Sequence, residues 1–221
     1  MNLEYPLILA SSSPRRQFLM KEIGFQFLVA HPGIDESFPP DMPVANVAPF
    51  LAEQKAKVFA SRLQNEIVLT SDTVVILEDM ILNKPLDRED AISMLAGLSG
   101  KTHTVITAVC LTSKSKIDCF EDRTDVTFKH LLPAEIEFYV DHYKPFDKAG
   151  AYGAQECLPA GVNPCSSEEI DFLKRIGKLD LIDKSISTER AGMVAIEKIN
   201  GSYFNVMGLP VHKVYTHLTR F

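Results

Sequence analysis

Eight polar residues from six separated segments lie at the ends of predicted elements or on otherwise apolar faces. They are Ser11, Arg15, Arg16, Glu36, Lys55, Asp72, Lys84 and Gln155. Arginine and lysine side chains are good donors to a polyphosphate, and carboxylates suit the divalent metal that accompanies one. The residue types therefore predict a site for an anionic ligand that is bound together with a metal.

The first of these segments is a short apolar strand followed by the start of a helix. Residues 6–9 are apolar, residues 11–13 are serines that suit an N-cap, and Pro14 suits the first helical position because it lacks an N–H. Arg15 and Arg16 in the first turn oppose the helix dipole, which favours anions at this end. We therefore expect an anion here; the alternative is a capped helix with two solvated arginines.

Asp72 is the least expected acid in the chain. It lies between the β-rich runs 66–70 and 74–77, and aspartate is depleted in strands. The pattern predicts two strand pieces interrupted around Asp72, whose carboxylate is exposed at a bulge or strand end, paired, or coordinated. The turn predicted at residues 78–79 forms a hairpin that returns Lys84 towards Asp72.

Lys55 and Glu36 each have an ordinary and a functional interpretation. Lys55 lies on the apolar stripe of a helix predicted over residues 46–64, either as a stem that reaches solvent at the rim or as an ammonium directed at a ligand anion. Asp35 and Glu36 lie in a proline-bearing loop, either as a solvated pair or as carboxylates available to a magnesium-type ion.

The remaining elements are predicted from periodicity, caps and breakers. Residues 25–30 and 193–199 favour strands, and residues 102–112 and 117–128 favour two long paired strands. Helices are predicted from Asp87 to near Gly97 or Gly100, from Pro133 to before Pro145, from the capping box at 166–169 to Gly177, and from Pro210 to Leu218. Residues 179–190 have no clear period.

Composition limits the possible classes of function. The chain has 221 residues, 46% of them apolar, which is enough for one core arranged as one body or two lobes. The net charge of −6 offers no broad basic surface, so we expect no nucleic-acid partner. Apolar runs of five or six residues are too short to span a membrane, and the N-terminal residues do not resemble a secretory signal.

Four cysteines without a CxxC pair fit a reduced cytoplasmic protein better than a disulfide framework or zinc site; they are Cys110, Cys119, Cys157 and Cys165.

Common nucleotide and hydrolase signatures do not occur in the sequence. There is no Walker-type phosphate loop, no dinucleotide-binding glycine fingerprint and no nucleophile elbow. The six histidines do not have the spacing of metal ligands.

A series of motifs in order along nearly the whole chain resembles the Maf family of nucleoside triphosphate pyrophosphatases. The motifs are Leu-Ala-Ser-x-Ser-Pro-Arg-Arg at residues 9–16, Ile34-Asp35-Glu36, Gln54-Lys55-Ala56, Ser71-Asp72-Thr73-Val74-Val75, Asn83-Lys84-Pro85, Leu98-Ser99-Gly100, the stretches 124–128 and 147–153, Asn200-Gly201-Ser202-Tyr203 and Gly208-Leu209-Pro210. Where family members commonly have alanine and glycine, this chain has Ser71 and Asn83.

The resemblance implies an α/β, Maf/ITPase-like fold, in which helices flank a central mixed, twisted sheet in two lobes with the active-site cleft between them. It also implies hydrolysis of the α–β phosphoanhydride of a nucleoside triphosphate, with Mg²⁺ or Mn²⁺ as cofactor. By the same resemblance, Asp72 would be the proton acceptor, and Asp72 and Glu36 would be metal ligands. Lys55 and Lys84 would be catalytic cations that hold the triphosphate. Ser11 and Arg16 would be further triphosphate ligands. Specificity would fall on Arg15, Thr73 and Gln155, which resemble the branch that prefers dTTP and UTP. The alternatives are 7-methyl-GTP or another modified nucleotide as substrate, and a regulator of cell division that binds nucleotide without turnover.

We interpret residues 1–221 as a single domain of this type with an insertion at about residues 157–190. In the family, the residue matching Gln155 is followed within about a dozen residues by the strand that leads to the Asn200-Gly201 motif. The insertion could cover the base pocket, change the accepted base or form a homodimer contact. We therefore hypothesise that it affects base choice or assembly rather than chemistry.

Overall fold

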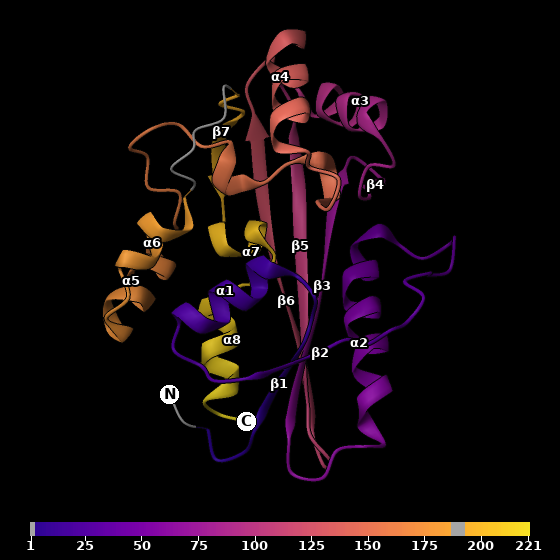
Figure 1. Ribbon diagram of the computed structural model, residues 1–221, viewed down its shortest axis with the longest axis vertical. Helices are drawn as coiled ribbons and strands as arrows, with labels where there is room; N and C mark the ends of the chain where they lie inside the picture. The colour runs from indigo at the N-terminus through magenta and orange to yellow at the C-terminus, as the bar shows by residue number, and fades with distance from the viewer. Residues whose placement is uncertain (1–2, 187–192) are drawn as a thin grey trace.

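A mixed seven-stranded sheet forms the centre of the molecule in the computed structural model, which describes residues 3–186 and 193–221 (Figure 1). The strand order is β2-β1-β3-β5-β6-β7, and β4 pairs with the end of β3. β1 pairs in parallel with β2 and β3, and the other pairs are antiparallel. The strands are β1 Leu7–Ala10, β2 Leu28–Ala30, β3 Ile67–Leu77, β4 Met80–Leu82, β5 Thr102–Thr112, β6 Ile117–Phe128 and β7 Ile196–Asn200.

Helices cover both faces of this sheet (Figure 1). They are α1 Pro14–Glu22, α2 Val47–Ala60, α3 Arg88–Leu98, α4 Pro133–Tyr143, α5 Ser167–Ile176, α6 Asp180–Ser185, α7 Tyr203–Met207 and α8 Val211–Leu218, with 3₁₀ turns at Val44–Asn46, Ala149–Ala151 and Ala154–Glu156. The α/β class with a mixed central sheet is therefore confirmed. Within the described residues, every helix is too short or too polar to cross a membrane.

The two faces of β3 belong to different cores. Val74 and Ile76 pack with α2, whereas Val75 and Leu77 pack with the larger cluster that includes α1, α3, α4 and α8. Side chains alternate between the faces of a strand, so Asp72 shares the α2 face with Val74. Ser71 and Thr73 by the same alternation lie on the opposite face.

One edge of β3 is paired only at its two ends. β1 pairs with residues 67–69, and β4 pairs with residues 75–77, whereas β5 pairs continuously with the other edge. Residues 70–74 therefore have no strand partner on the first edge in the described part of the chain. α1 and α8 lie towards the β1 end, and α3 and α4 lie towards the β4 end (Figure 1). A cavity lined by Asp72, by the start of α1 and by residues 147–149 and 152–155 opens at this edge.

Most predicted elements are confirmed, and residues 102–112 and 117–128 form strands with those limits. One prediction is wrong, and one helix was not predicted. β3 continues through Ser71-Asp72-Thr73 instead of breaking there, because Asp72 is paired and so needs no exposed bulge. Residues 180–185 form α6, a helix too short to show a period in the sequence. The end of the predicted insertion, including Arg190, lies outside the described residues.

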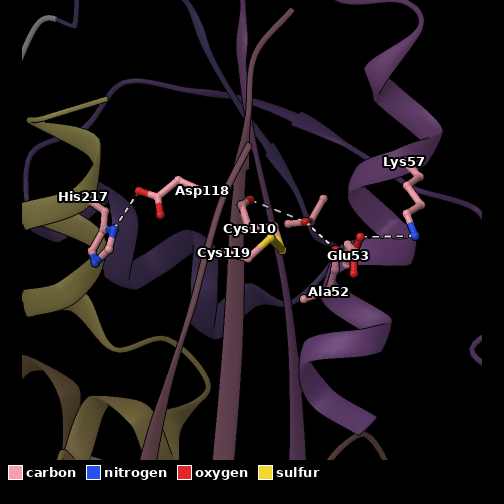
Figure 2. The surroundings of a disulfide bond; sticks show 8 residues. Ala52, Glu53, Lys57, Cys110, Asp118, Cys119 and His217 are labelled. Carbon is pink, nitrogen blue, oxygen red and sulfur yellow. Dashed lines mark hydrogen bonds and ion pairs between the residues drawn. A yellow bond between two sulfur atoms is a disulfide. The ribbon is translucent and has the colours of Figure 1, made fainter. Parts of the chain in front are cut away.

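The expectation of four reduced cysteines is wrong for one pair. Cys110 on β5 and Cys119 on β6 form a disulfide, shown in Figure 2, whereas Cys157 and Cys165 are free thiols. The two bonded cysteines are direct partners in the antiparallel register, with their Cα atoms 4.1 Å apart. Sequence spacing alone did not reveal this because the register of the two strands decides which residues lie opposite.

Candidate active site

A cavity of about 590 Å³ opens at the unpaired edge of β3. All nine residues singled out from the sequence line it, although they come from segments far apart in the chain: Ser11, Arg15, Arg16, Glu36, Lys55, Asp72, Thr73, Lys84 and Gln155. These nine residues include four cationic side chains and two carboxylates around one space.

On the α2 face of β3, Lys55 bridges two carboxylates. Lys55 is buried, and its Nζ lies 2.5 Å from Oδ1 of Asp72 and 2.7 Å from Oε1 of Glu36. The apolar stripe that packs α2 on β3 brings this lysine inward, so it is not a solvated stem at the rim. Asp72 is therefore paired, which is one of the alternatives that the sequence left open.

The surroundings of this cluster shift the pKa values of the two carboxyl groups in opposite directions. Burial raises the pKa of Asp72, although the neighbouring Lys55 and Arg16 oppose that effect. Burial also acts to raise the pKa of Glu36, but the hydrogen bond and charge of Lys55, with Lys84 and Arg16, outweigh it and lower this pKa. A raised pKa makes Asp72 the stronger proton acceptor of the two.

On the opposite face of β3, Arg16 is fixed by four acceptors. Nε donates to the Gly208 carbonyl at 2.8 Å, Nη1 donates to the Ser71 carbonyl at 2.9 Å and to Ser11 Oγ at 3.4 Å, and Nη2 donates to Thr73 Oγ1 at 2.8 Å. The Ser71 carbonyl belongs to the edge of β3 that has no neighbouring strand. Arg16 therefore closes that edge and holds its positive charge beside the cavity.

Arg15 points to a different part of the cavity from Arg16. Its Nη1 lies 3.3 Å from Oδ2 of Asp147, in the segment that leads to Gln155. Gln155 donates from Nε2 to Oε1 of Glu156 at 3.2 Å, and its buried Oε1 has no hydrogen-bond partner in the described structure. The two neighbouring arginines thus face two different walls of the cavity.

Lys84 follows β4, so the hairpin after β3 brings it to the same cavity as Asp72. Its charge contributes to the lowered pKa of Glu36.

The 3₁₀ turn at residues 149–151 packs against the β3–β4 hairpin. There Gly150 has a φ of +71° and lies so close to Val75 that a Cβ on it would be 3.0 Å from Cγ1 of Val75. Glycine is therefore needed at this position.

Sequence reasoning missed Lys148, Asp147 and Glu156 as candidate site residues. Lys148 is buried at the cavity wall, with its Nζ 2.9 Å from Asp147 Oδ1 and 3.7 Å from Glu156 Oε1. Glu156 also accepts a 2.5 Å hydrogen bond from Tyr139 OH. The glycines of residues 147–155 had marked the segment, but an Asp-Lys pair in a loop carries no signal of which partner it will meet.

The carboxylates of this cavity suit a divalent metal that arrives with a phosphate ligand. Among the described residues, no group of three or more His, Cys, Asp or Glu side chains could hold a metal alone. Asp72 and Glu36 nevertheless converge on the single Nζ of Lys55, so they come from separate elements to one point. Magnesium is commonly held by one or two carboxylates with substrate phosphates completing its shell, and the pair fits that requirement.

A family model and nearly full-length relatives agree on one family for this chain. A family model described as "Maf-like protein" matches residues 6–170 and 162–221. The chain is 41% identical to a Bacteroides fragilis protein named "dTTP/UTP pyrophosphatase", over 97% of this chain and 95% of that protein. It is 39% identical to a Flavobacterium johnsoniae protein of the same name, over 98% and 95% of the two chains. A solved Staphylococcus aureus Ham1 protein aligns with 56% of this chain and 71% of its own, at 14% identity and a TM-score of 0.39.

Proposed function

Because this chain belongs to the Maf-like protein family, we propose that it is a nucleoside triphosphate pyrophosphatase acting on dTTP and UTP. The products would be the nucleoside monophosphate and pyrophosphate. The observation that carries the proposal is the buried Lys55–Asp72 pair with the exposed Glu36 at its edge, which shares one cavity with Arg16 and Lys84. Such a cavity supplies both a proton acceptor and the cations that a triphosphate requires.

In this proposal Asp72 accepts a proton from the water that attacks the phosphoanhydride. Arg16, Lys55 and Lys84 bind the triphosphate and stabilise the charge that develops on its oxygens, and Ser11 contributes a hydroxyl at the same wall. When substrate enters, Lys55 exchanges part of its contact with the two carboxylates for phosphate oxygens. That exchange leaves Asp72 free to accept the proton.

The cofactor in the proposal is Mg²⁺ or Mn²⁺, held by Asp72 and Glu36 together with the phosphates. When bound, it would polarise the phosphate oxygens and neutralise their charge. Glu36 suits this role because its lowered pKa keeps it anionic.

Base choice would come from Arg15, Thr73 and Gln155. The unpartnered Oε1 of Gln155 is an acceptor, and the bases of both dTTP and UTP carry an N–H at N3 that can donate to such a group. Arg15 lies on the same wall as Gln155 because it forms an ion pair with Asp147. Thr73 accepts a hydrogen bond from Arg16, so it links base choice to the triphosphate side of the cavity. We also propose that the chain acts in the cytoplasm as one domain, with an insertion that affects base choice or assembly; light scattering would detect a homodimer.

A pyrophosphate-release panel tests this function. Wild-type protein is assayed with dTTP, UTP, dCTP, dATP, GTP and 7-methyl-GTP, with Mg²⁺, with Mn²⁺ and after chelation. We expect release from dTTP and UTP that requires metal. Preference for 7-methyl-GTP would overturn the proposed base choice, and nucleotide binding without any release would indicate a regulator instead of an enzyme.

A further inference from the structure

Glu169 is a fully buried carboxylate in α5, outside the active-site cavity. It accepts hydrogen bonds from five donors: Ser166 N at 2.9 Å, Ser166 Oγ at 3.2 Å, Ser202 Oγ at 2.6 Å, Tyr203 N at 3.0 Å and Phe204 N at 3.0 Å. The two Ser166 donors lie at the start of α5 itself, where the bond from Ser166 N and a reciprocal bond from Glu169 N to Ser166 Oγ at 3.2 Å form the capping box that the sequence predicts. The other three belong to the start of α7, so one carboxylate joins two helices that are more than thirty residues apart in the chain.

The opposite end of α7 contacts the guanidinium of Arg16. Gly208 ends the helix, and its carbonyl accepts the 2.8 Å hydrogen bond from Arg16 Nε. The carbonyl of Asn205, within α7, accepts from Thr107 Oγ1 at 3.0 Å. That hydroxyl lies 2.9 Å from Thr73 Oγ1, which accepts from Arg16 Nη2. Two sides of the guanidinium therefore depend on where α7 lies.

The insertion also contacts α7 and α1 through α6. Tyr203 OH donates to the Ser185 carbonyl at 3.4 Å, and Lys184 Nζ lies 3.0 Å from Glu22 Oε2 on α1, the helix that carries Arg16. Figure 1 shows α5 and α6 on the side of the sheet where α1, α7 and α8 lie. Phe172 of α5 packs edge-on against Tyr215 of α8, with ring centroids 5.3 Å apart.

We propose that Glu169 is a positioning residue for triphosphate hydrolysis, acting through α7 to hold Arg16 in place. The proposal rests on the proposed function and extends it, because it gives the segment around residues 157–186 a part in triphosphate binding. The sequence had suggested only base choice or assembly for this segment. A buried carboxylate that satisfies five donors fixes both helices, since removing its charge leaves several of those donors without a good acceptor. A displacement of about 1 Å at Arg16 would be enough to lower activity on the order of 10²-fold.

The test compares Glu169→Gln with Glu168→Gln, its exposed neighbour on the same helix, whose side chain is 76% exposed. Each protein is assayed for dTTP hydrolysis and for binding of a dTTP analogue with a methylene bridge between the α- and β-phosphates. We expect Glu169→Gln to raise both KM and the Kd of the analogue on the order of tenfold or more. Glu168→Gln should leave both values unchanged.

A double-mutant cycle separates positioning of Arg16 from general damage to the fold. Glu169→Gln is combined with Arg16→Ala, and analogue binding is measured in both backgrounds. We expect Glu169→Gln to weaken analogue binding when Arg16 is present but to have no further effect in the Arg16→Ala background. An equal loss in both backgrounds, or unchanged binding by Glu169→Gln alone, would overturn the proposal.

Ser202→Ala provides a second variant should Glu169→Gln fail to fold, because it removes only one of the five donors. It should weaken analogue binding by a smaller factor than Glu169→Gln does, again only when Arg16 is present; no loss of binding would contradict the proposal.

Wild-type activity reports separately on the proposed function. If wild-type protein neither binds nor hydrolyses dTTP, both proposals fail, whereas active wild-type protein with a normal Glu169→Gln variant overturns the positioning role alone.

Discussion

The two faces of β3 hold their charged groups in different ways. On the α2 face, Lys55, Asp72 and Glu36 contact one another directly through side chains. On the opposite face, Arg16 donates to the backbone carbonyls of Ser71 and Gly208 and to the hydroxyls of Ser11 and Thr73, so its place depends on segments far from it in the chain. The Lys55–Asp72 pair is set by one helix packing on one strand, with Glu36 added from the loop before α2, whereas the position of Arg16 requires several elements to meet.

This difference predicts where substitutions will act. Changes on the α2 face should alter proton transfer and its pH dependence with little effect on neighbouring structure. Changes on the Arg16 face should alter triphosphate binding, including changes made at a distance.

The largest expected effect is at Asp72. Asp72→Asn removes the proton acceptor, and general base catalysis contributes about 10² to 10⁴-fold, so kcat for pyrophosphate release should fall by that factor. Analogue binding should change little, because the cations of the site remain. Asp79→Asn, in the exposed turn after β3, is the control and should keep wild-type kcat. A variant at position 72 with near-normal turnover would falsify the proposed role.

The next effect is at Arg16. Arg16→Lys keeps a positive charge but loses the planar donors that contact Gly208, Ser71 and Thr73. Charge-assisted hydrogen bonds are worth roughly 1.5–3 kcal/mol each, so the loss of one corresponds to a decrease in kcat/KM of about 10 to 10²-fold. Steady-state kinetics on dTTP measures it, with Arg62→Lys at an exposed position as control. Equal kinetics for the two variants would show that the contacts of Arg16 do not matter for catalysis.

Lys55 should determine the pH dependence of Asp72. The carboxylate accepts a proton only when ionised, so kcat/KM should be present above the pKa of Asp72 and lost as the pH falls through it. Lys55 lowers that pKa against the effect of burial. Lys55→Gln should therefore move the acidic limb of the kcat/KM profile to higher pH, in addition to lowering its maximum. Lys57→Gln, exposed on the same helix, should leave the limb in place; an unmoved limb in the Lys55 variant would count against the pairing.

The smallest expected effect on rate is at Arg15. Its partner is Asp147 near the proposed base pocket, and a partly exposed ion pair contributes about 1 kcal/mol or less. Arg15→Lys should change the ratio of activity on dTTP to that on purine triphosphates more than it lowers the rate on dTTP. Competition assays with paired substrates measure this ratio. A uniform decrease on all substrates would place Arg15 with Arg16 on the triphosphate side.

Sequence reasoning worked best where the signal is local. The limits of β5 and β6, the Asp87 cap and the hairpin after β3 follow from alternation, capping and turn residues within a few positions. The oddly placed polar side chains also identified the cavity, because a charge on an apolar face needs a partner or a ligand.

The features that were missed depend on residues distant in sequence. Asp72 can remain inside a continuous strand only because Lys55 packs over it, and Cys110 meets Cys119 only through the strand register. Glu169 looked like an ordinary capping-box residue, since the donors that give it a second role begin thirty-three residues later at Ser202. No local pattern contains such pairings.

The most direct measurement is identification of the bond that breaks. Wild-type protein is incubated with dTTP and Mg²⁺, and the products are separated and quantified beside those from Asp72→Asn. We predict equal amounts of dTMP and pyrophosphate from wild-type protein and little product from the variant. Release of dTDP and phosphate, or equal turnover by the two proteins, would contradict the assignment of this cavity to α–β phosphoanhydride hydrolysis.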